Sequence, residues 1–284
     1  MAGRVDGKVA VITGAASGFG EATARLMAAE GAYVVLADLQ EERGAGVAAS
    51  IGERAVFQRC DVSSEADVAA VVDLAVARFG HLDVMFNNAG IVGAVGPIDQ
   101  IPLEEYEFTM AVLLRSVFLG MKHAARVMKP RESGVILSTS SIAGVMGGLG
   151  PHVYTAAKSA IVGLTRNVAA ELGPWGVRAV AIVPGNHATA MTADVALGDH
   201  TAVEQAAERF RDRKTPLHGR PGLADDIAHA ALWLSSDDAG FVSGTALVVD
   251  GGLTTGSREN IERNQGTFAS RRPLIRQAGL RGLA

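Results

Sequence analysis

The beginning of the chain constrains the fold most strongly. Residues 8–13 form a short apolar run rich in β-branched side chains, which is typical of a strand buried on both faces. The run leads into a turn with Gly14, Gly18 and Gly20, and a helical pattern follows. Glycines let the backbone approach a pyrophosphate, and a helix N-terminus offers free N–H groups. The sequence therefore predicts a phosphate cradle, although its G-x-x-x-G-x-G spacing differs from the usual G-x-G-x-x-G.

Acidic residues end the next two apolar runs. Residues 33–37 lead to Asp38, which lies where a carboxylate accepts hydrogen bonds from the adenosine ribose and repels a 2′-phosphate. The site is therefore predicted to prefer NAD over NADP; the alternative is that Asp38 is an N-cap of the following helix. Asp61 follows the run 55–60 and is expected either to cap the next helix or to accept from the adenine amino group.

Tyr154 and Lys158 lie one turn apart in a helix-forming run, so both side chains share one helix face. A tyrosine that acts as a base near neutral pH needs a pKa about 3 units below its ordinary value. A cation about 4 Å away supplies roughly 4 kcal/mol at an effective dielectric of about 20, and an oxidised nicotinamide would add a second positive charge. The pair predicts a proton-transfer site, although the spacing alone also fits an ordinary surface pair.

Together these segments resemble the short-chain dehydrogenase/reductase family, from about Gly7 to Gly252. The glycine turn matches the family's cofactor loop, and Ser141 falls on its catalytic serine. Three further segments match its N-N-A-G, P-G-x-x-x-T and D-G-G motifs, namely residues 87–90, 184–189 and 250–252.

The resemblance implies a catalytic set of Ser141, Tyr154 and Lys158. It also implies NAD as the cofactor and a set of cofactor-binding residues. In chain order these are Gly14, Ser17, Gly18, Phe19, Gly20, Asp38, Leu39, Asp61, Val62, Asn88, Ala89, Gly90, Tyr154, Lys158, Pro184, Gly185 and Thr189.

One position departs from the family pattern. Val112-Leu113-Leu114-Arg115-Ser116 aligns with V-N-L-x-G, so that Leu113 replaces the asparagine of a Ser-Tyr-Lys-Asn tetrad and Ser116 replaces the glycine. In the family the asparagine carbonyl binds a water of a proton relay, and its side chain steadies a local irregularity of the helix. Leucine keeps the carbonyl but cannot make the side-chain bonds. We expect Leu113 to support catalysis through its backbone.

Strand and helix patterns alternate without a linker up to Gly252. We therefore expect one Rossmann-type, doubly wound α/β domain over residues 1–252, with helices on both faces of a mostly parallel, seven-stranded sheet. The resemblance implies the strand order 3-2-1-4-5-6-7, which places the site at the carboxyl ends of the strands. The expected strands are residues 8–13, 33–38, 55–60, 82–87, 133–139, 177–183 and 245–249.

Residues 253–284 form a basic C-terminal extension with six arginines and two glutamates. Because members of the family are commonly tetramers or dimers, we expect a homotetramer or homodimer in which this extension embraces a neighbouring subunit. The alternative is a solvated, mobile terminus.

Other properties mainly exclude functions. The net charge of −4 gives no electrostatic footprint for nucleic acid. Cys60 is the single cysteine, which excludes an intrachain disulfide, and the histidines show no metal-ligand spacing, so no metal is expected. No uncharged stretch is long enough to cross a bilayer and no signal peptide is evident, so we expect a cytoplasmic protein without a membrane partner.

These features predict an NAD-dependent enzyme that interconverts a secondary alcohol and a ketone. Tyr154 is expected to take the hydroxyl proton, Lys158 to lower the pKa of Tyr154 and hold the nicotinamide ribose, and Ser141 to bind the substrate oxygen. The alternatives are an NAD-binding protein with little turnover because of Leu113, an NADP-linked ketone reductase, and an isomerase or dehydratase on the same fold.

The family resemblance implies that residues 186–219 close the substrate pocket, and their amphipathic stretch 203–210 is predicted to act as a lid. This pocket is mainly apolar, which favours a cyclic or steroid-like alcohol. The side chains expected to face the substrate are Ser141, His152, His187 and Met191, with Met146 and Leu149 nearby; an ordinary loop histidine is the alternative for His187.

Overall fold

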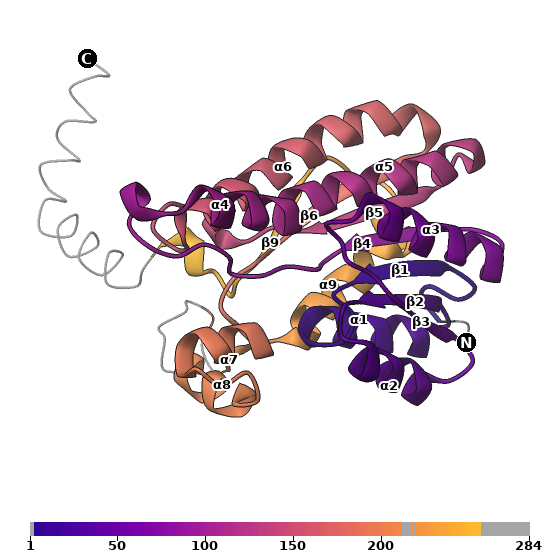
Figure 1. The fold of residues 1–284 in the computed structure, drawn as a ribbon. Coiled ribbons are helices and arrows are strands. Elements are labelled where there is room, and N and C mark those ends of the chain that lie inside the picture. The colour runs from indigo at the N-terminus through magenta and orange to yellow at the C-terminus, as the bar shows by residue number, and fades with distance from the viewer. Residues whose placement is uncertain (1–2, 212–216, 218–219, 257–284) are drawn as a thin grey trace, which may run out of the picture.

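The structure is a computed structural model that describes residues 3–211, 217 and 220–256. Within these residues, seven parallel strands form one sheet in the order β3-β2-β1-β4-β5-β6-β9 (Figure 1). The strands are β1 (Val9–Thr13), β2 (Tyr33–Asp38), β3 (Ala55–Arg59), β4 (Val84–Asn87), β5 (Gly134–Thr139), β6 (Val177–Pro184) and β9 (Ala246–Val249). Each strand lies within its predicted range except β6, which continues one residue further. The predicted fold class and strand order are confirmed.

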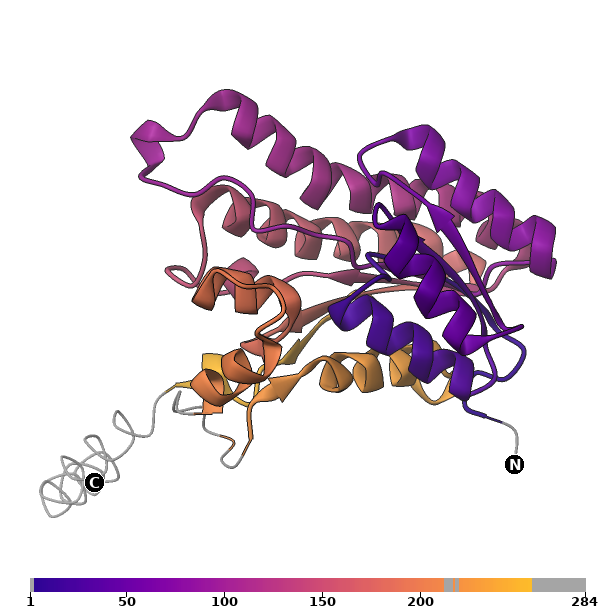
Figure 2. The same cartoon turned by 60° about the horizontal axis from the view of Figure 1, so that its bottom comes forward.

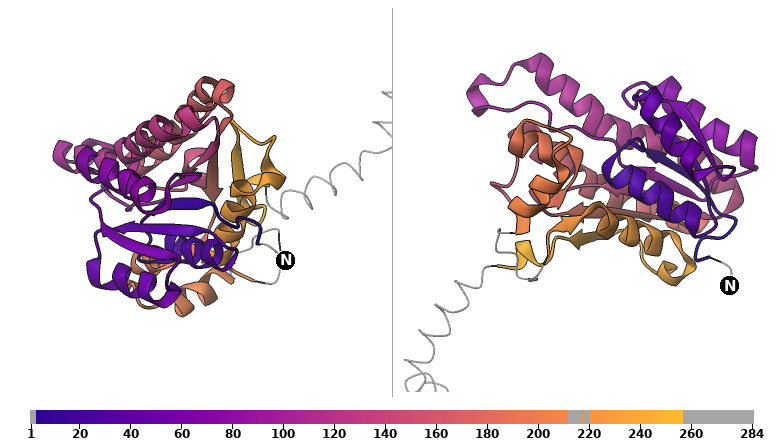
Figure 3. Two further views of the ribbon diagram at one scale, coloured as in Figure 1. Left: turned by 90° about the vertical axis from the view of Figure 1, so that its right-hand side faces the viewer. Right: turned by 90° about the horizontal axis from the view of Figure 1, so that it is seen from below.

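Helices cover both faces of the sheet (Figure 3). One layer contains α1 (Gly18–Ala29), α2 (Glu41–Ile51) and α9 (Ala224–Ser235), and the other contains α3 (Glu65–Phe79), α5 (Ser116–Met128) and α6 (His152–Leu172). Side chains of β1 alternate between the layers: Ala10 and Ile12 pack with α1 and α9, whereas Val9 and Val11 pack with α3 and α5. A strand between two apolar layers is buried throughout, which explains the uninterrupted apolar run.

Local sequence determines where helices begin and end. At the start of α3, the Ser64 hydroxyl accepts a hydrogen bond from the Asp67 N–H. The helix ends at Gly80, whose φ of 88° lies in the left-handed region that glycine adopts most readily. These two residues fix the length of the helix that follows β3.

The crevice of the fold lies next to β1. This strand pairs with β2 on one side and with β4 on the other, so Ala10 is in register with both Val34 and Val84. The connections leave β1 and β4 in opposite directions, and the loops after their carboxyl ends diverge. An open α/β sheet binds its ligands at such a point.

A second segment stands at this end of the sheet (Figure 2). It contains β7 (His187–Ala188), α7 (Ala190–Leu197), α8 (Val203–Arg211) and β8 (Gly222–Leu223), and β7 pairs with β8. Its own apolar cluster is small and consists of Ala188, Ala193, Ala206 and Phe210. The predicted amphipathic stretch 203–210 is helical, whereas residues 212–216 and 218–219 of the predicted substrate segment lie outside the described residues.

The helix before β5 changes pitch along its length. It starts as α4 (Leu103–Met110), passes through a π-helical turn at Ala111–Arg115 and continues as α5. The remaining short elements are 3₁₀ turns at Ile98–Gln100, Lys129–Arg131, Ile142–Gly144, Gly173–Trp175, Asp237–Ala239 and Leu253–Thr255. Most of the predicted extension 253–284 lies outside the described residues, which end at residue 256.

Candidate active site

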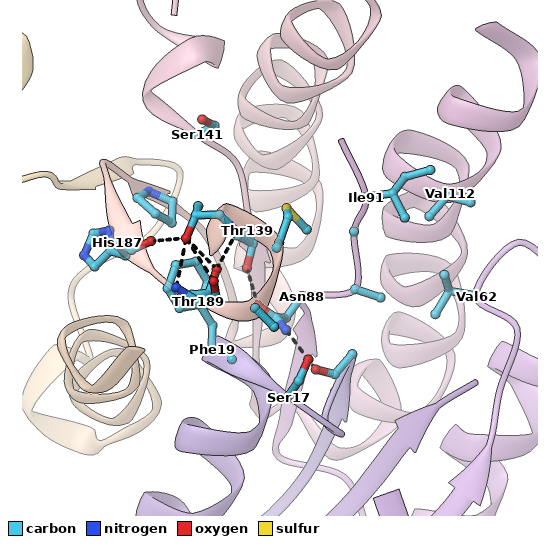
Figure 4. A pocket seen from close by; sticks show the side chains of 18 of the residues that line it. Ser17, Phe19, Val62, Asn88, Ile91, Val112, Thr139, Ser141, His187 and Thr189 are labelled. Atoms are coloured by element: carbon cyan, nitrogen blue, oxygen red, sulfur yellow. Dashed lines mark hydrogen bonds between the residues drawn. The ribbon is translucent and has the colours of Figure 1, made fainter. Parts of the chain in front are cut away.

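A pocket of about 380 Å³ opens where β1, β2, β4, β5 and β6 end (Figure 4). It is lined by residues from both predicted sets, including Gly14 and Asp38 of the cofactor set and Ser141, Tyr154 and Lys158 of the catalytic set. The structure thus brings together segments that are far apart in the sequence.

The glycine turn is packed too closely for larger residues. Gly14 has a φ of 66°, and a Cβ on it would lie 2.8 Å from the Cα of Ala89. A Cβ on Gly20 would overlap the carbonyl oxygen of Gly14. Helix α1 begins at Gly18, and Ser17 at its N-cap position makes no side-chain cap bond. The turn therefore presents backbone N–H groups at a helix N-terminus, which fits the pyrophosphate of a dinucleotide.

Asp38 joins the glycine turn to the start of α2. It is 8% exposed, and its carboxylate accepts hydrogen bonds from the N–H groups of Ala16 at 2.9 Å and Gln40 at 3.0 Å. Gln40, not Asp38, occupies the N-cap position of α2. Each oxygen of Asp38 has one backbone donor and can accept further bonds, so the carboxylate fits a ribose with two hydroxyl groups.

The neighbouring strand end contributes apolar surface. Asp61 accepts from the N–H and hydroxyl of Ser63 at 2.9 and 2.7 Å, and it is not among the residues that line the pocket. Val62 does line it, and Figure 4 places Val62 on the same side as Ile91 and Val112. This side has the character of a site for a flat aromatic ring such as adenine.

Asn88 ties three strand ends together. Its side-chain amide donates to the Thr13 carbonyl at 3.0 Å, and its side-chain oxygen accepts from the Thr139 hydroxyl at 3.2 Å. Its backbone N–H donates to the Thr13 hydroxyl at 2.9 Å. Asn88 therefore holds the ends of β1, β4 and β5 in one arrangement, and Ala89 and Gly90 follow it along the pocket wall.

The predicted catalytic side chains meet at the start of α6. The Lys158 amino group donates to the Thr139 carbonyl at 2.8 Å and lies 5.5 Å from the centre of the Tyr154 ring. Ser141 is hydrogen-bonded to Tyr154, and its hydroxyl also accepts from the Ala143 N–H at 3.1 Å. A phenol, a hydroxyl and an amine therefore converge in one pocket, which is suited to moving a proton at a substrate oxygen.

Burial controls the ionisation of Tyr154 and Lys158. It raises the pKa of Tyr154, and the hydrogen bond from Ser141 opposes the rise only in part. It lowers the pKa of Lys158 to about 8. Lys158 is not among the groups that shift the pKa of Tyr154 here, so the lowering expected from the spacing stays a prediction. A buried lysine at its lowered pKa carries less charge than an exposed one.

The opposite wall comes from the segment after β6. A Cβ on Gly185 would lie 2.6 Å from the Cβ of Asp250, so glycine is needed after Pro184. Thr189 accepts from the Thr192 N–H at 3.3 Å and thereby caps α7, and Met191 also lines the pocket.

His187 lines the pocket but is 3% exposed. Its ring contacts that of Phe19 edge-on at 5.5 Å, and its Nδ1 lies 3.2 Å from the Gly185 carbonyl oxygen (Figure 4). Burial lowers its pKa. The ring therefore packs the substrate segment against the start of α1.

Not every expected side chain reaches the pocket. Gly20 and Asp61 of the cofactor set and His152 of the substrate set are not among its lining residues, and neither are Met146 and Leu149. His152 is exposed at the first residue of α6, and Met146 and Leu149 are exposed in the preceding loop. Of the expected substrate contacts, Ser141, His187 and Met191 line the pocket.

Sequence reasoning missed Thr139, Ile91 and Val112, which line the pocket. Thr139 is the last residue of β5, so its position at a strand's carboxyl end was the available signal. Ile91 and Val112 are apolar residues of a loop and a helix, and nothing in their local pattern distinguishes them from core residues.

The described part of the chain contains neither a cluster of metal-ligating side chains nor a helix that could span a membrane. Among the described residues, no group of three or more His, Cys, Asp or Glu side chains is arranged to hold a metal ion. The described helices also include none with the length and apolar character needed to span a membrane.

The fold and the site define a Rossmann-type nucleotide-binding enzyme, and comparison with known proteins makes the class specific. The family model described as "Enoyl-(Acyl carrier protein) reductase" matches residues 14–254. Momilactone A synthase of Oryza sativa subsp. japonica is 49% identical over 251 residues, which cover 87% of this chain and 90% of the relative. (+)-Borneol dehydrogenase 2 of Salvia officinalis is 42% identical over 261 residues, with 89% and 91% covered.

The crystal structure of levodione reductase matches with a TM-score of 0.79 at 36% identity and covers 88% of this chain and 99% of that one. The chain belongs to the short-chain dehydrogenase/reductase family. It is accordingly an oxidoreductase of the alcohol dehydrogenase and ketoreductase class that uses a nicotinamide cofactor.

Proposed function

We propose that this protein is an NAD-dependent dehydrogenase that interconverts an apolar, cyclic secondary alcohol and the corresponding ketone. The observation that carries the proposal is the meeting of Ser141, Tyr154 and Lys158 in the pocket that also contains the glycine turn and Asp38. One pocket therefore holds both a dinucleotide cradle and a group that can transfer a proton.

The cofactor would be held at both ends by residues of this chain. The turn from Gly14 to Phe19 would hold the pyrophosphate, Asp38 would bind the adenosine ribose, and Lys158 and Thr189 would hold the nicotinamide end; all of them line the pocket except Ala15 and Ala16 of the turn. NAD is favoured because the buried Asp38 carboxylate repels a 2′-phosphate and because Ala15, Ala16 and Ser17 offer no basic side chain to bind one.

Tyr154 is the proton acceptor for alcohol oxidation and the donor for ketone reduction. Ser141, which is already hydrogen-bonded to Tyr154, binds the same substrate oxygen and stabilises the charge that develops there. When bound, the nicotinamide supplies the hydride acceptor or donor and a positive charge in its oxidised form. That charge acts in the same direction as Lys158 and favours the ionised tyrosine.

The proposed substrate class follows from the pocket and the relatives. Ala190 and Met191 of the substrate segment line the pocket with apolar side chains, and burial lowers the pKa of His187. One curated relative is named for borneol, a cyclic secondary alcohol. Both points support an apolar ring that carries one oxygen.

The test is NADH formation over a panel of cyclic secondary alcohols that begins with borneol. We expect turnover with NAD, and we expect Tyr154→Phe to lower kcat by about 10³-fold because proton transfer by a positioned group contributes about 10²–10⁴-fold. NAD affinity, measured by calorimetry, should change little in the variant.

Three alternative functions predict different results. Tight NAD binding without turnover on the whole panel would favour a binding protein, whose motivation is Leu113 in the place of the tetrad asparagine. Turnover only with NADP would contradict the assignment to Asp38. A reaction without net redox change would indicate an isomerase or dehydratase.

We also propose that the chain forms a homotetramer or a homodimer. An outer groove between α4, the π-helical turn and α6 carries apolar side chains at Met110, Leu114 and Leu164, and it is bordered by Tyr106 and Phe118, which are 41% and 50% exposed. Exposed apolar patches of this kind are typical of interaction sites. Mass measurement of the wild type and of Phe118→Glu tests this: an unchanged mass would exclude this groove as the interface.

Truncation after Gly252 addresses the basic extension. If residues 253–284 embrace a neighbouring subunit, the truncated chain should form oligomers with fewer subunits. An unchanged number of subunits with unchanged kinetics would favour a solvated terminus. The cytoplasmic location and the domain limits at residues 1–252 and 253–284 stay predictions from the sequence.

A further inference from the structure

The π-helical turn between α4 and α5 changes which backbone groups are paired. The Ser116 N–H donates to the Ala111 carbonyl, five residues earlier, instead of the Val112 carbonyl that an α-helix would use. Single π-turns inside α-helices frequently occur at functional sites. Here Val112 lines the pocket and Leu113 follows it.

The Ser116 side chain satisfies the carbonyl that its own N–H skips. Its hydroxyl donates to the Val112 carbonyl oxygen at 2.5 Å, and Ser116 is 7% exposed. A buried carbonyl without a partner costs about 1–3 kcal/mol, so the hydroxyl removes a penalty that would otherwise favour a regular α-helix. Ser116 is thus chemically matched to the π-turn.

The π-turn brings Leu113 next to Gly90, which Lys158 also approaches. Leu113 is fully buried, and its Cδ2 lies 3.3 Å from the position of a Cβ on Gly90. The Lys158 amino group lies 3.8 Å from the same position. Leucine and lysine therefore share the small space that the missing Cβ of Gly90 leaves open.

Lys158 has few polar neighbours in this space. Among the described residues its amino group has one hydrogen-bond acceptor, the Thr139 carbonyl. Of the elements packed around it, α6 contributes the titratable Tyr154 and the π-turn contributes Arg115, which is exposed. The end of β5 and the loop at Gly90 contribute no charged side chain. The low pKa of Lys158, caused by burial alone, agrees with this setting.

We propose that Leu113 and Ser116 are a matched pair of positioning residues: the Ser116 hydroxyl maintains the π-helical turn, and the turn holds the Leu113 side chain as an apolar wall beside Lys158. The pair sets the pH range in which the lysine is charged. Part of this inference, the effect on turnover, rests on the proposed function; the effect on the lysine does not.

The test is the titration of Lys158 in the protein without cofactor, followed by 13C NMR with lysine labelled at Cε. The signal is assigned by its absence in Lys158→Arg. In Leu113→Asn an amide oxygen becomes available to the ammonium, so we expect the midpoint to rise by about one pH unit. Leu113→Met, which keeps an apolar wall, is the control and should titrate like the wild type.

Ser116 is tested by the same titration. Ser116→Ala leaves the Val112 carbonyl unpaired, so the midpoint should move, whereas Ser116→Thr keeps a hydroxyl that can bond to the carbonyl one turn earlier and should preserve it. The proposal is also supported if Ser116→Ala does not fold while Ser116→Thr folds and Lys158 titrates in it with the wild-type midpoint. A folded Ser116→Ala protein with the wild-type midpoint overturns the role of Ser116.

Equal midpoints in Leu113→Asn and Leu113→Met overturn the role of Leu113. If turnover is present, the limb of the pH–rate profile that depends on Lys158 should shift with the NMR midpoint. If the protein oxidises no secondary alcohol with either cofactor, the proposed function fails, while the titration still decides the inference.

Discussion

The cofactor side and the substrate side of the pocket are built differently. On the cofactor side, Gly14 and Gly20 touch neighbouring backbone, and Asp38 is fixed by two backbone N–H groups. On the substrate side, α7 and α8 rest on a cluster of four buried residues, and Val195 of α7 is 66% exposed. The cofactor side therefore tolerates few substitutions, whereas residues on the substrate side can vary without disturbing the sheet. Such a division suits an enzyme that keeps one cofactor and adapts its substrate.

The largest test of this contrast compares two phenylalanines. Phe86 is fully buried in β4, and Phe210 is 7% exposed in the small cluster of α8. Phe86→Ala should lower the free energy of unfolding by about 3–5 kcal/mol. Phe210→Ala should change global unfolding by about 1 kcal/mol or less and raise KM for the alcohol, because α8 opens locally. Denaturant titration and steady-state kinetics measure both; similar losses of global stability would break the contrast.

Lys158 lies between the two sides and carries a cost of burial. Its pKa is about 8 in the folded protein against an ordinary value of 10.5, so the unfolded chain binds more protons between these values and stability rises with pH through that range. The shift corresponds to about 3 kcal/mol of destabilisation at neutral pH.

Unfolding of the wild type and of Lys158→Met from pH 7 to pH 10 measures this cost. The stability of the wild type should rise relative to that of the variant by about 2–3 kcal/mol, because other groups titrate equally in both proteins. If the free energies of unfolding of the two proteins change in parallel with pH, burial of Lys158 does not destabilise the folded protein.

On the cofactor side, Asp38→Ser should change the choice of cofactor. Loss of the carboxylate removes a ribose acceptor and the repulsion of a 2′-phosphate, so the ratio of kcat/KM for NAD to that for NADP should fall by about 10²-fold, or about 2.7 kcal/mol. Glu41→Gln, a nearby exposed carboxylate, is the control. An unchanged ratio in Asp38→Ser would mean that other residues select the cofactor.

The smallest effect is expected on the substrate side. Met191 is 39% exposed and lines the pocket, so Met191→Ala should raise KM for an apolar alcohol by about 5-fold, equivalent to about 1 kcal/mol of lost apolar contact. The affinity for NAD should stay the same. A variant that lost NAD affinity instead would place Met191 on the cofactor side.

Much of the fold and part of the site are predictable from the sequence. The strands were predictable because seven apolar runs end in turn residues, and the glycine turn because few other features require three glycines after a strand. The meeting of Ser141, Tyr154 and Lys158 followed from family spacing. These features depend on local pattern and on strand order, both of which a linear sequence carries.

The features that the sequence did not predict depend on the direction of individual side chains and backbone groups. Asp61 and Val62 are neighbours, yet Val62 lines the pocket while Asp61 bonds to Ser63. His152 was expected in the pocket but is exposed, because it occupies the first position of α6. The family resemblance implied a local irregularity of the helix near Leu113, but not that it is a π-turn, because a change of hydrogen-bond partner has no periodicity of its own. In each of these cases a shift by one residue along the chain decides which group faces the pocket or which hydrogen bond forms.

The order of the strands also bears on how the protein is made. The edge strand β9, residues 246–249, pairs with β6 and is the last of the described strands to be synthesised, whereas the described residues that line the pocket lie at or before Thr192. Pairings between distant segments form slowly, and domains begin to fold during synthesis. Until β9 emerges, β6 has an unpaired edge next to a pocket whose lining is already synthesised. An unpaired edge of this kind can template association with another chain, so during synthesis the risk of misassociation lies along β6 rather than at the nucleotide crevice.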